Sequence, residues 1–394
     1  MTDKLERGMR VCGVIAEYDP FHRGHERHLR LAREKTRADY VVCVMSGSFT
    51  QRGLPALLPA HARAEMALCC GADAVLQLPY AFSVREAEYF ALGGVGILNA
   101  LQCVTHLSFG CETDDLALLR RAASLLEQPD AAFQEAVQGK LSRGLSFAAA
   151  QGQALAERLS IPANALNAPN AALAICYLRA LLRLQSPIQP VPVLRRQDYH
   201  ACELESFPSA SAVRGAILRG DWSGIKGALP EAALPVLRSA LLQGICPPDA
   251  LDRALRRCLL LASPDEIAAW PGIGEGLETR IKKAAETAVS REELIHLVKT
   301  RRYTQGRLNR ALCHGLLGVK KDALPQAPAA ARLLGFRASA RPLLKAFRAS
   351  GFPLYTRLAR TPEAALDARA DEMWRIGAGF PQADAYRQAP VIVE

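Results

Sequence analysis

The sequence lacks the long apolar runs that a membrane protein needs. Within its 394 residues, no stretch reaches the roughly 18 uninterrupted apolar residues of a transmembrane helix. The opening segment MTDKLERGMR is polar and has no apolar region of the kind found in secretory signals. We therefore expect a cytoplasmic protein that does not partner a membrane.

Paired cysteine motifs are also missing. The chain has 11 cysteines, an odd and scattered set in which none is spaced as Cys-x-x-Cys. This argues against a disulfide framework and against a zinc ribbon, so we expect reduced thiols and no metal site held by cysteines. Hydrophobic residues make up 50% of the chain, enough to fill the core of two or three domains.

One long segment has almost no acidic residues. Between Leu294 and Ser350 there are twelve lysines and arginines and a single acid, Asp322. This segment therefore carries a charge of about +11, while the net charge of the whole chain is +10. The rest of the chain is then close to neutral. A basic segment within a folded domain is typical of a site for a polyanion such as nucleic acid, although it is also compatible with an ordinary solvated helical face.

The first part of the chain alternates strand and helix patterns. Short apolar or β-branched runs, typical of strands, occur at residues 10–18, 38–47, 72–79, 104–110 and 188–196. Amphipathic segments lie between them, which predicts an α/β fold with a Rossmann-like parallel sheet. The helical stretch from about Asp115 to Leu159 has no strand partner and is predicted to be an insertion. Beyond Asp221 the pattern is almost entirely helical, so we expect an α/β domain at 1–225 and a helical, basic domain at 226–394.

The stretch VIAEYDPFHRGHERHL (14–29) holds three histidines within seven positions. They could be metal ligands, core side chains or the floor of a phosphate site. A zinc pair on a helix would more naturally have the spacing His-Glu-x-x-His, which is absent. The apolar run before them predicts a strand, and the helix should begin near Gly24. Free N–H groups and the positive dipole end of such a helix bind phosphate, and His22 and His25 would lie beside it.

"His22-Arg23-Gly24-His25" resembles the His-x-Gly-His signature of the nucleotidyltransferase superfamily, whose members bind ATP on a Rossmann-like sheet. The run from Pro208 to Arg214, PSASAVR, is similar to the second phosphate motif of that superfamily, Ile-Ser-Ser-Thr-x-Ile-Arg. Taken alone, this run is a helix start with Ser209 or Ser211 as the N-cap.

The wider resemblance is to the tRNA(Met) cytidine acetate ligase family. The blocks EYDPFHRGHERHL, MSGSFTQRGLPA, EAEYFALGGVGILNAL, SFGCE, APNAALAICYLRAL and KTRRYTQGRLNRALCHGLLG resemble its motifs in order along nearly the whole chain. The resemblance implies an enzyme that activates acetate with ATP, with Mg²⁺, and acetylates N4 of the wobble cytidine of elongator tRNA(Met). It says nothing about the oligomeric state.

The resemblance also implies site residues. His22 and His25 would be catalytic. The implied ATP contacts are Ile15, Glu17, Tyr18, Pro20, Phe21, Gly24, His28, Gly110, Asn170, Arg195, Ser211 and Arg214, where Arg196 is an alternative to Arg195. The implied tRNA contacts are Lys299, Arg301, Arg302, Tyr303, Arg307 and Arg310. Tyr303 could stack on a base or simply pack at a helix end.

Some positions depart from the family pattern. Asp19 replaces an Asn, Ala171 replaces the second Asn of a Pro-Asn-Asn block, and Pro59-Ala60 replaces an Asp-Lys pair that would supply a phosphate-side lysine. Activity is then reduced, or Arg52 or Arg63 takes the place of the lysine. Two other functions stay open: a small-molecule adenylyltransferase and a non-catalytic tRNA-binding protein.

Overall fold

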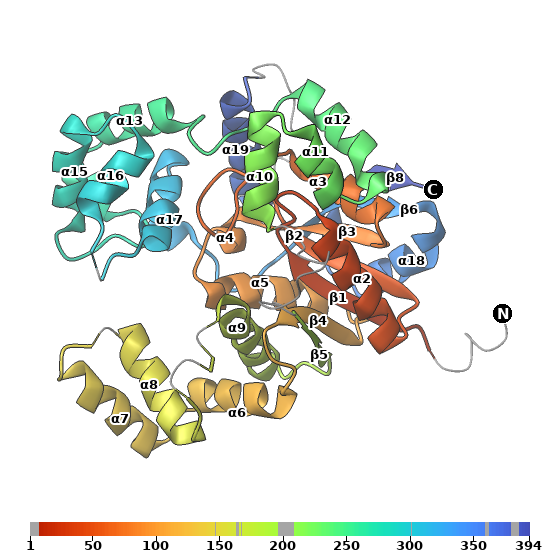
Figure 1. Cartoon of the computed structure of the whole chain (residues 1–394), viewed down its shortest axis with the longest axis horizontal. Helices are drawn as coiled ribbons and strands as arrows, with labels where there is room; N and C mark the ends of the chain where they lie inside the picture. Colours follow the sequence, from red (N-terminus) through yellow and green to blue (C-terminus); the bar gives the residue numbers. More distant parts are fainter. Residues whose placement is uncertain are drawn as a thin grey trace.

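A single sheet runs through the centre of the molecule. The computed structural model describes residues 8–145, 147–162, 165–166, 168–195, 209–300, 302–358, 362–379 and 386–394. In this part of the chain, eight strands follow the order β5-β4-β1-β2-β3-β6-β7, and β8 pairs with β6 (Figure 1). The strands are β1 (Val11–Ala16), β2 (Tyr40–Ser46), β3 (Ala74–Leu78), β4 (His106–Cys111), β5 (Gln189–Leu194), β6 (Ala331–Arg337), β7 (Leu354–Tyr355) and β8 (Val391–Val393).

The first five strands are parallel, as the sequence predicted, and each lies close to its predicted bounds. Their side chains alternate between two cores: Val42 and Val44 of β2 face one, whereas Val41 and Cys43 face the other. The strand order reverses between β1 and β4. In an open parallel sheet, the crevice at the carboxyl ends of such strands is where ligands bind.

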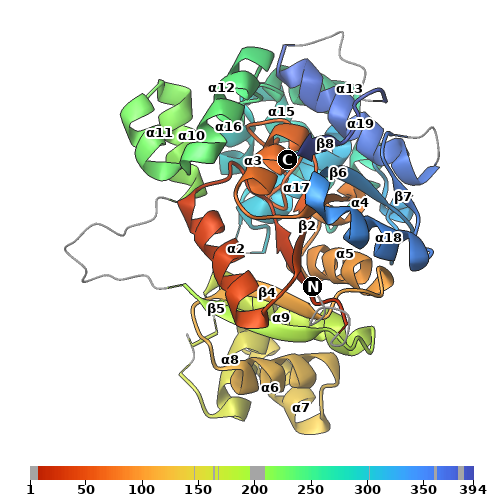
Figure 2. The ribbon, with the colours of Figure 1, turned by 90° about the vertical axis from the view of Figure 1, so that its right-hand side faces the viewer.

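Helices cover both faces of the sheet (Figure 2). One face is packed against α5 (Ala87–Ala100), α9 (Pro169–Arg183) and α18 (Arg341–Ala349), and the other against α2 (Arg23–Thr36), α3 (Ala60–Cys69), α10 (Ala210–Arg219), α11 (Trp222–Ala228) and α12 (Leu234–Gln243). The predicted insertion is confirmed as three helices that extend away from the sheet, α6 (Leu116–Glu127), α7 (Ala131–Leu141) and α8 (Phe147–Leu159). Among the described residues, none of the helices combines the length and the hydrophobicity of a transmembrane span.

Five further helices form a separate group beside the sheet, which we term the helical lobe (Figure 1). They are α13 (Asp252–Leu261), α14 (Pro264–Ala268), α15 (Leu277–Thr287), α16 (Arg291–Val298) and α17 (Gln305–Leu316). The lobe has its own apolar core, which also includes Trp374 of α19 (Pro362–Gly377) and Tyr80 of α4 (Tyr80–Ser83). The core of the lobe therefore extends to α4 and α19 outside the lobe.

A glycine fixes the contact between the lobe and the sheet. Gly53 has a φ of +72°, and a Cβ placed on it would lie 2.5 Å from the backbone nitrogen of Arg310 in α17. Only glycine fits this conformation and this approach without strain. From the lobe, Arg291 donates a hydrogen bond of 3.0 Å to the Gly53 carbonyl oxygen. The loop after β2 is thus held directly against α17.

The prediction that the chain beyond Asp221 is almost entirely helical is wrong at its end. β6 pairs antiparallel with β3, and β7 and β8 pair with β6, so residues after 330 complete the N-terminal sheet. β7 has two residues and β8 has three, which is too few for a period of two to show. β6 is apolar at most positions but includes the buried Arg332, which obscures its pattern.

Candidate active site

The turn between β1 and α2 places two imidazole rings at a helix N-terminus. His22 is the N-cap of α2, and the N–H of Gly24 donates to its Nδ1 over 3.1 Å. The N–H of His22 in turn donates to Nδ1 of His25 over 3.3 Å. The two rings stack with centroids 3.7 Å apart and an interplanar angle of 24°. This reciprocal capping box holds both rings beside the first turn of the helix.

The capping hydrogen bonds determine where each ring carries its proton. Because Nδ1 accepts in both His22 and His25, the neutral form of each ring carries its proton on Nε2. Burial, together with the nearby positive charge of Arg195, lowers the pKa of His22 to about 4. Burial and the neighbouring His22 lower the pKa of His25 well below its ordinary value. Near neutral pH, both rings are therefore uncharged Nε2–H donors.

Two aromatic residues of the motif pack against the ring of His25. Tyr18 and Phe21 are 2% and 0% exposed, and both rings lie against His25, with centroids 4.8 and 5.5 Å away. The Tyr18 hydroxyl is hydrogen-bonded to the sulfur of Cys43. Both residues are buried in the core, and the ATP contacts expected at these two positions stay predictions.

The other residues of the β1–α2 connection that were predicted to contact ATP are Ile15, Pro20 and Glu17. Ile15 packs against α5, where a Cβ on Gly94 would lie 2.7 Å from its side chain. Pro20 is buried and follows a cis peptide bond. Glu17 accepts the N–H of Gln51 over 2.6 Å, and desolvation raises its pKa. The carboxyl end of β1 is thus connected to the loop that follows β2.

His28 lies one turn further along α2. Its Nε2 is 3.1 Å from the hydroxyl oxygen of Ser108 on β4. Burial lowers its pKa to about 4, with Arg195 as the second cause. This contact ties α2 to the strand on the far side of the crevice.

Arg195 closes the site from the direction of β5. It packs over Gly110 of β4, where a Cβ would lie 3.0 Å from the Cδ of Arg195. Its Nη1 donates to Oδ1 of Asn170 over 3.1 Å. The structure therefore brings the predicted residues Gly110, Asn170 and Arg195 together beside the histidines. The alternative residue, Arg196, lies outside the described residues.

Glu112 is a residue of this site that the sequence analysis missed. Its carboxylate accepts the side-chain N–H of Asn170 over 2.6 Å and the backbone N–H of Ala171 over 2.9 Å. It thereby caps the first turn of α9 and fixes the amide that holds Arg195. Its position directly after a predicted strand could have identified it.

The second phosphate motif, residues 208–214, contacts the histidine loop through Arg214. Ser209, rather than Ser211, caps α10. Arg214 donates to the hydroxyl oxygen of Ser211 over 3.0 Å, to the carbonyl oxygen of Asp19 over 2.6 Å and to its carboxylate over 3.3 Å. The Asp at position 19 thus forms an ion pair with Arg214, and Leu57 also donates to it over 2.7 Å.

Of the two arginines considered for the missing lysine, Arg63 is excluded. It is 0% exposed and donates to the carbonyl oxygens of Glu17, Ser46, Gly47 and Leu58. It therefore supports the loop backbone and has no access to a ligand. Arg52 is exposed. Pro59, in the place of the family's acidic residue, is the N-cap of α3.

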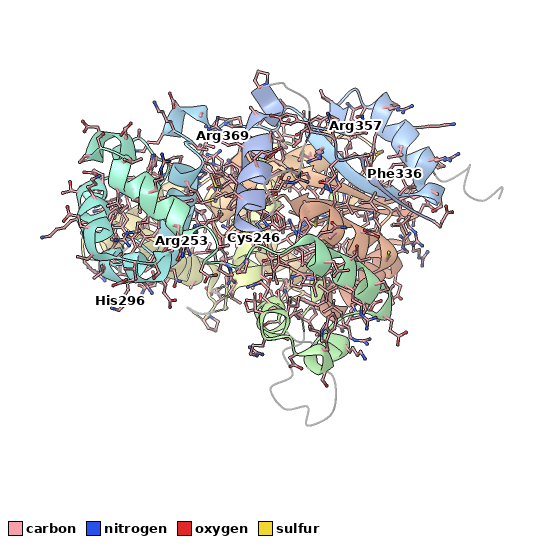
Figure 3. The ribbon with its side chains drawn as sticks, turned by 90° about the horizontal axis from the view of Figure 1, so that it is seen from above. Cys246, Arg253, His296, Phe336, Arg357 and Arg369 are labelled. Atoms are coloured by element: carbon pink, nitrogen blue, oxygen red, sulfur yellow. The ribbon has the colours of Figure 1, made fainter. Side chains whose placement is uncertain are left out.

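The basic segment does not form one surface. Arg332 is 0% exposed and pairs with Asp371 over 2.9 Å, so it cannot contact a partner. The exposed Arg341, Lys345 and Arg348 lie on α18, on the opposite side of the molecule from α17 (Figure 1). In Figure 3, His296 of the lobe and Phe336 of β6 lie toward opposite ends of the molecule. Only the first part of the segment belongs to the helical lobe.

The predicted tRNA contacts differ in their exposure. Lys299 and Arg302 are exposed, and Arg302 pairs with Glu275. Of the two alternatives for Tyr303, the structure shows packing at a helix end: the residue is 6% exposed and its hydroxyl donates to the Gly274 carbonyl oxygen over 2.6 Å. Arg301 lies outside the described residues.

Two of these arginines lie deeper. Arg307 lies over the Tyr303 ring and donates to the Gly272 carbonyl oxygen over 2.9 Å. The side chain of Arg310 is 15% exposed. Both therefore border the junction of the lobe with the sheet, whereas Lys299 and Arg302 face outward.

Comparisons with known proteins agree with this geometry. The HIGH Nucleotidyl Transferase family model matches residues 9–388. The chain is 37% identical over 354 residues to the tRNA(Met) cytidine acetate ligase of Clostridium perfringens, covering 86% of this chain and 87% of the relative. It is 36% identical over 368 residues to that of Acetivibrio thermocellus, covering 89% and 88%.

Solved structures are similar over the full length. Thermotoga maritima TmcAL bound with alpha-thio ATP superimposes with a TM-score of 0.91 at 29% identity, covering 98% of this chain and 100% of that one. Its apo form superimposes with a TM-score of 0.90. The length of these matches agrees with the stacked histidine pair and the order of the strands. The chain belongs to the tRNA(Met) cytidine acetate ligase family of HIGH nucleotidyl transferases.

Proposed function

We propose that the protein is an ATP-dependent ligase that activates acetate as acetyl-adenylate and then acetylates N4 of the wobble cytidine of elongator tRNA(Met). The observation that carries this proposal is the pair of neutral imidazoles at the N-terminus of α2, at the point where the strand order reverses. The relatives named tRNA(Met) cytidine acetate ligase and the similar structure bound with alpha-thio ATP support it.

The residues present fit a triphosphate. The N-terminus of α2 provides backbone N–H groups and the positive end of its dipole. His22 and His25 add two Nε2–H donors without adding charge, and Arg195 adds a cation from the opposite side. Arg214 is held toward the same loop by Asp19. We propose that these groups bind the phosphates, while Gly24 and Gly110 leave room for ATP to approach the backbone.

Magnesium ions fit this site only as partners of the phosphates. Among the described residues, no group of three or more His, Cys, Asp or Glu side chains could hold a metal ion. Mg²⁺ usually keeps several waters and binds through substrate phosphates, where it neutralises charge.

The chemistry requires no nucleophile from the enzyme. An oxygen of acetate attacks the α-phosphorus of ATP, and the bond to pyrophosphate breaks. The N4 amine of cytidine then attacks the acyl carbon of the mixed anhydride, AMP leaves, and the nitrogen releases a proton to water. Catalysis is therefore mainly positioning and charge stabilisation, which are the tasks that neutral donors and a helix N-terminus can perform.

We further propose that the exposed cations of the helical lobe hold the tRNA while the sheet binds ATP. In this division, α11 and α12 belong with the sheet on which they pack, as do β6 to β8, and the lobe begins with α13 rather than near residue 225. The anticodon loop already presents its bases unpaired, so the enzyme has no duplex to open. We propose a cytoplasmic location, because the proposed substrate is a tRNA.

The proposal is tested with total tRNA, ATP and isotope-labelled acetate, followed by mass spectrometry of the nucleosides. Wild type should produce labelled acetylcytidine, and His25→Ala should lose most of the yield. His106→Gln is the matched control, because His106 starts β4 at the opposite end of the strand. Equal yields from wild type and His25→Ala would remove His25 from the mechanism.

A second assay separates the two other functions. Pyrophosphate exchange into ATP should depend on acetate, which a non-catalytic tRNA-binding protein would not support. Affinity for tRNA should fall steeply with salt concentration, since each neutralised phosphate releases counterions. A small-molecule adenylyltransferase would catalyse exchange and bind no tRNA.

A further inference from the structure

A basic cavity lies between the helical lobe and the sheet, away from the histidine pair. It has a volume of about 230 Å³, and its charged lining residues are Arg85, Glu86, Arg307, Arg310 and Lys321. Four cations thus face one carboxylate. The cavity is smaller than the roughly 300 Å³ at which pockets for whole drug-sized ligands begin, which favours a single phosphate group over a complete nucleotide.

Arg310 carries an unsatisfied positive charge at this cavity. Its side chain is 15% exposed, yet within the described residues it forms no hydrogen bond, and its one ion pair, with Glu86, is long at 3.8 Å. Its guanidinium nitrogens are not fully buried, so they reach the cavity and can donate to a ligand there. The adjacent His314 supplies no further charge, because burial lowers its pKa to about 3. An anion in the cavity would supply the missing partner.

The other cations are positioned by backbone oxygens that leave their charge in place. Arg85 donates to the Pro325 carbonyl oxygen over 2.9 Å, and Lys321 donates to that of Ala268 over 2.7 Å. Arg307 is likewise held by a carbonyl oxygen of the lobe. Each side chain is therefore ordered before a ligand arrives and keeps further N–H donors for it.

One residue links the cavity to the loop that holds the histidine pair. The side chain of Gln51 donates to the carbonyl oxygen of Arg85 over 2.9 Å, while its backbone N–H donates to Glu17 over 2.6 Å. The cavity also borders the start of α5, whose first turn has no side-chain cap. The backbone N–H groups at this helix start favour a negatively charged group in the cavity.

We infer that this cavity binds a backbone phosphate of the tRNA, next to the cytidine that is modified. The inference rests on the proposed function and extends it, because it assigns Arg85 and Lys321 to RNA binding together with Arg307 and Arg310. The ligand is a phosphodiester held at the junction of two lobes. A phosphate fixed there sets the distance between the RNA backbone and the acetyl group.

The test measures tRNA affinity over a series of salt concentrations for wild type, Arg310→Gln and Lys321→Gln. Each variant should bind about tenfold more weakly, and the slope of log affinity against log salt should fall by about one. Lys345→Gln on the far helix α18 is the matched control and should keep the slope of wild type. Lys321 is exposed, so its variant tests the cavity even if Arg310→Gln fails to fold.

Four outcomes would count against the inference. If wild type binds and acetylates tRNA but both cavity variants bind it like wild type, the cavity assignment is wrong and the proposed function stands. The same follows if Lys345→Gln loses as much affinity. If inorganic phosphate stabilises wild type and not Arg310→Gln, while tRNA affinity is unchanged, the cavity holds a free anion instead. If wild type binds no tRNA, the proposed function fails and the inference fails with it.

Discussion

Arg195 donates a hydrogen bond of 3.1 Å to Asn170, whose amide donates at 2.6 Å to Glu112. Three elements meet in this chain of contacts: Glu112 follows β4, Asn170 begins α9 and Arg195 follows β5. The cation beside the histidines is therefore positioned by a carboxylate that never needs to contact ATP.

We expect Glu112→Gln to weaken ATP binding. The change removes the charged acceptor that orients Asn170, so Arg195 loses its fixed position, and the KM for ATP in pyrophosphate exchange should rise about tenfold. The effect on kcat should be smaller, because the acidic side chain acts through others. Glu127→Gln is the control, since Glu127 pairs with Arg179 and Arg183 on α9, away from the site. An unchanged KM in Glu112→Gln would show that Arg195 is held without it.

Gly110→Ala should also act through Arg195. The added methyl group would lie 3.0 Å from Cδ and 3.2 Å from Cγ of Arg195, which is closer than side chains normally pack. Arg195 must shift, so ATP affinity, measured by calorimetry, should fall several-fold while the fold is retained. Gly139→Ala in α7 is the comparison, because its methyl group meets nothing within 4 Å. It should stabilise the helix by up to about 1 kcal/mol and leave ATP binding alone.

Buried histidines should make the protein sensitive to acid. Burial lowers the pKa of His61 from 6.5 to about 3. Below about pH 6.5, the unfolded chain therefore binds a proton at His61 that the folded chain does not bind. The contribution of this residue to the free energy of unfolding is fully present above that pH and is lost as the pH falls toward about 3. At pH 5 this one residue should cost about 2 kcal/mol. Denaturant unfolding of wild type and His61→Gln at pH 7 and pH 5 measures it, and equal losses in both would exclude His61 as a cause.

The buried pair of Arg332 and Asp371 joins the C-terminal part to the sheet. Asp371 lies 2.9 Å from Arg332 and accepts the Ser48 hydroxyl over 2.5 Å. Asp371→Ala should cost about 3 to 5 kcal/mol of unfolding free energy, because it leaves a fully buried guanidinium without its carboxylate. The double variant Arg332→Met with Asp371→Ala should recover much of this loss in urea denaturation. Strictly additive losses would mean that the pair is not coupled.

The N-terminal sheet and the phosphate loop could be predicted from the sequence because their signals are local. Each strand from β1 to β5 is a short apolar run between helices, and the capping role of His22 and His25 lies within four positions of one turn. In contrast, β6 gains its partner only through pairing with β3, more than 250 positions earlier, as their register of Ala74 with Phe336 indicates. Contacts of that range leave no periodic trace.

The roles of single charged residues were the least predictable. Arg63 and Arg332 read as surface or ligand-binding cations in the sequence, yet both are 0% exposed, because the hydrogen-bond acceptors that stabilise them come from distant loops and helices. Tyr303 seemed suited to stacking and is buried by a contact with Gly274. Burial of a polar residue depends on the completed tertiary structure, which composition and spacing do not specify.

The helical lobe lies between two segments that both belong to the sheet, with β5 before it in the chain and β6 after it. It is therefore an internal excursion of the polypeptide and not an appendage at the end. Ending the chain after α17 would delete three strands and expose the edge of β3. The main defect of such a shortened protein should therefore be aggregation rather than a loss of RNA binding. To exchange this lobe between relatives, the chain would have to be cut both before α13 and after α17.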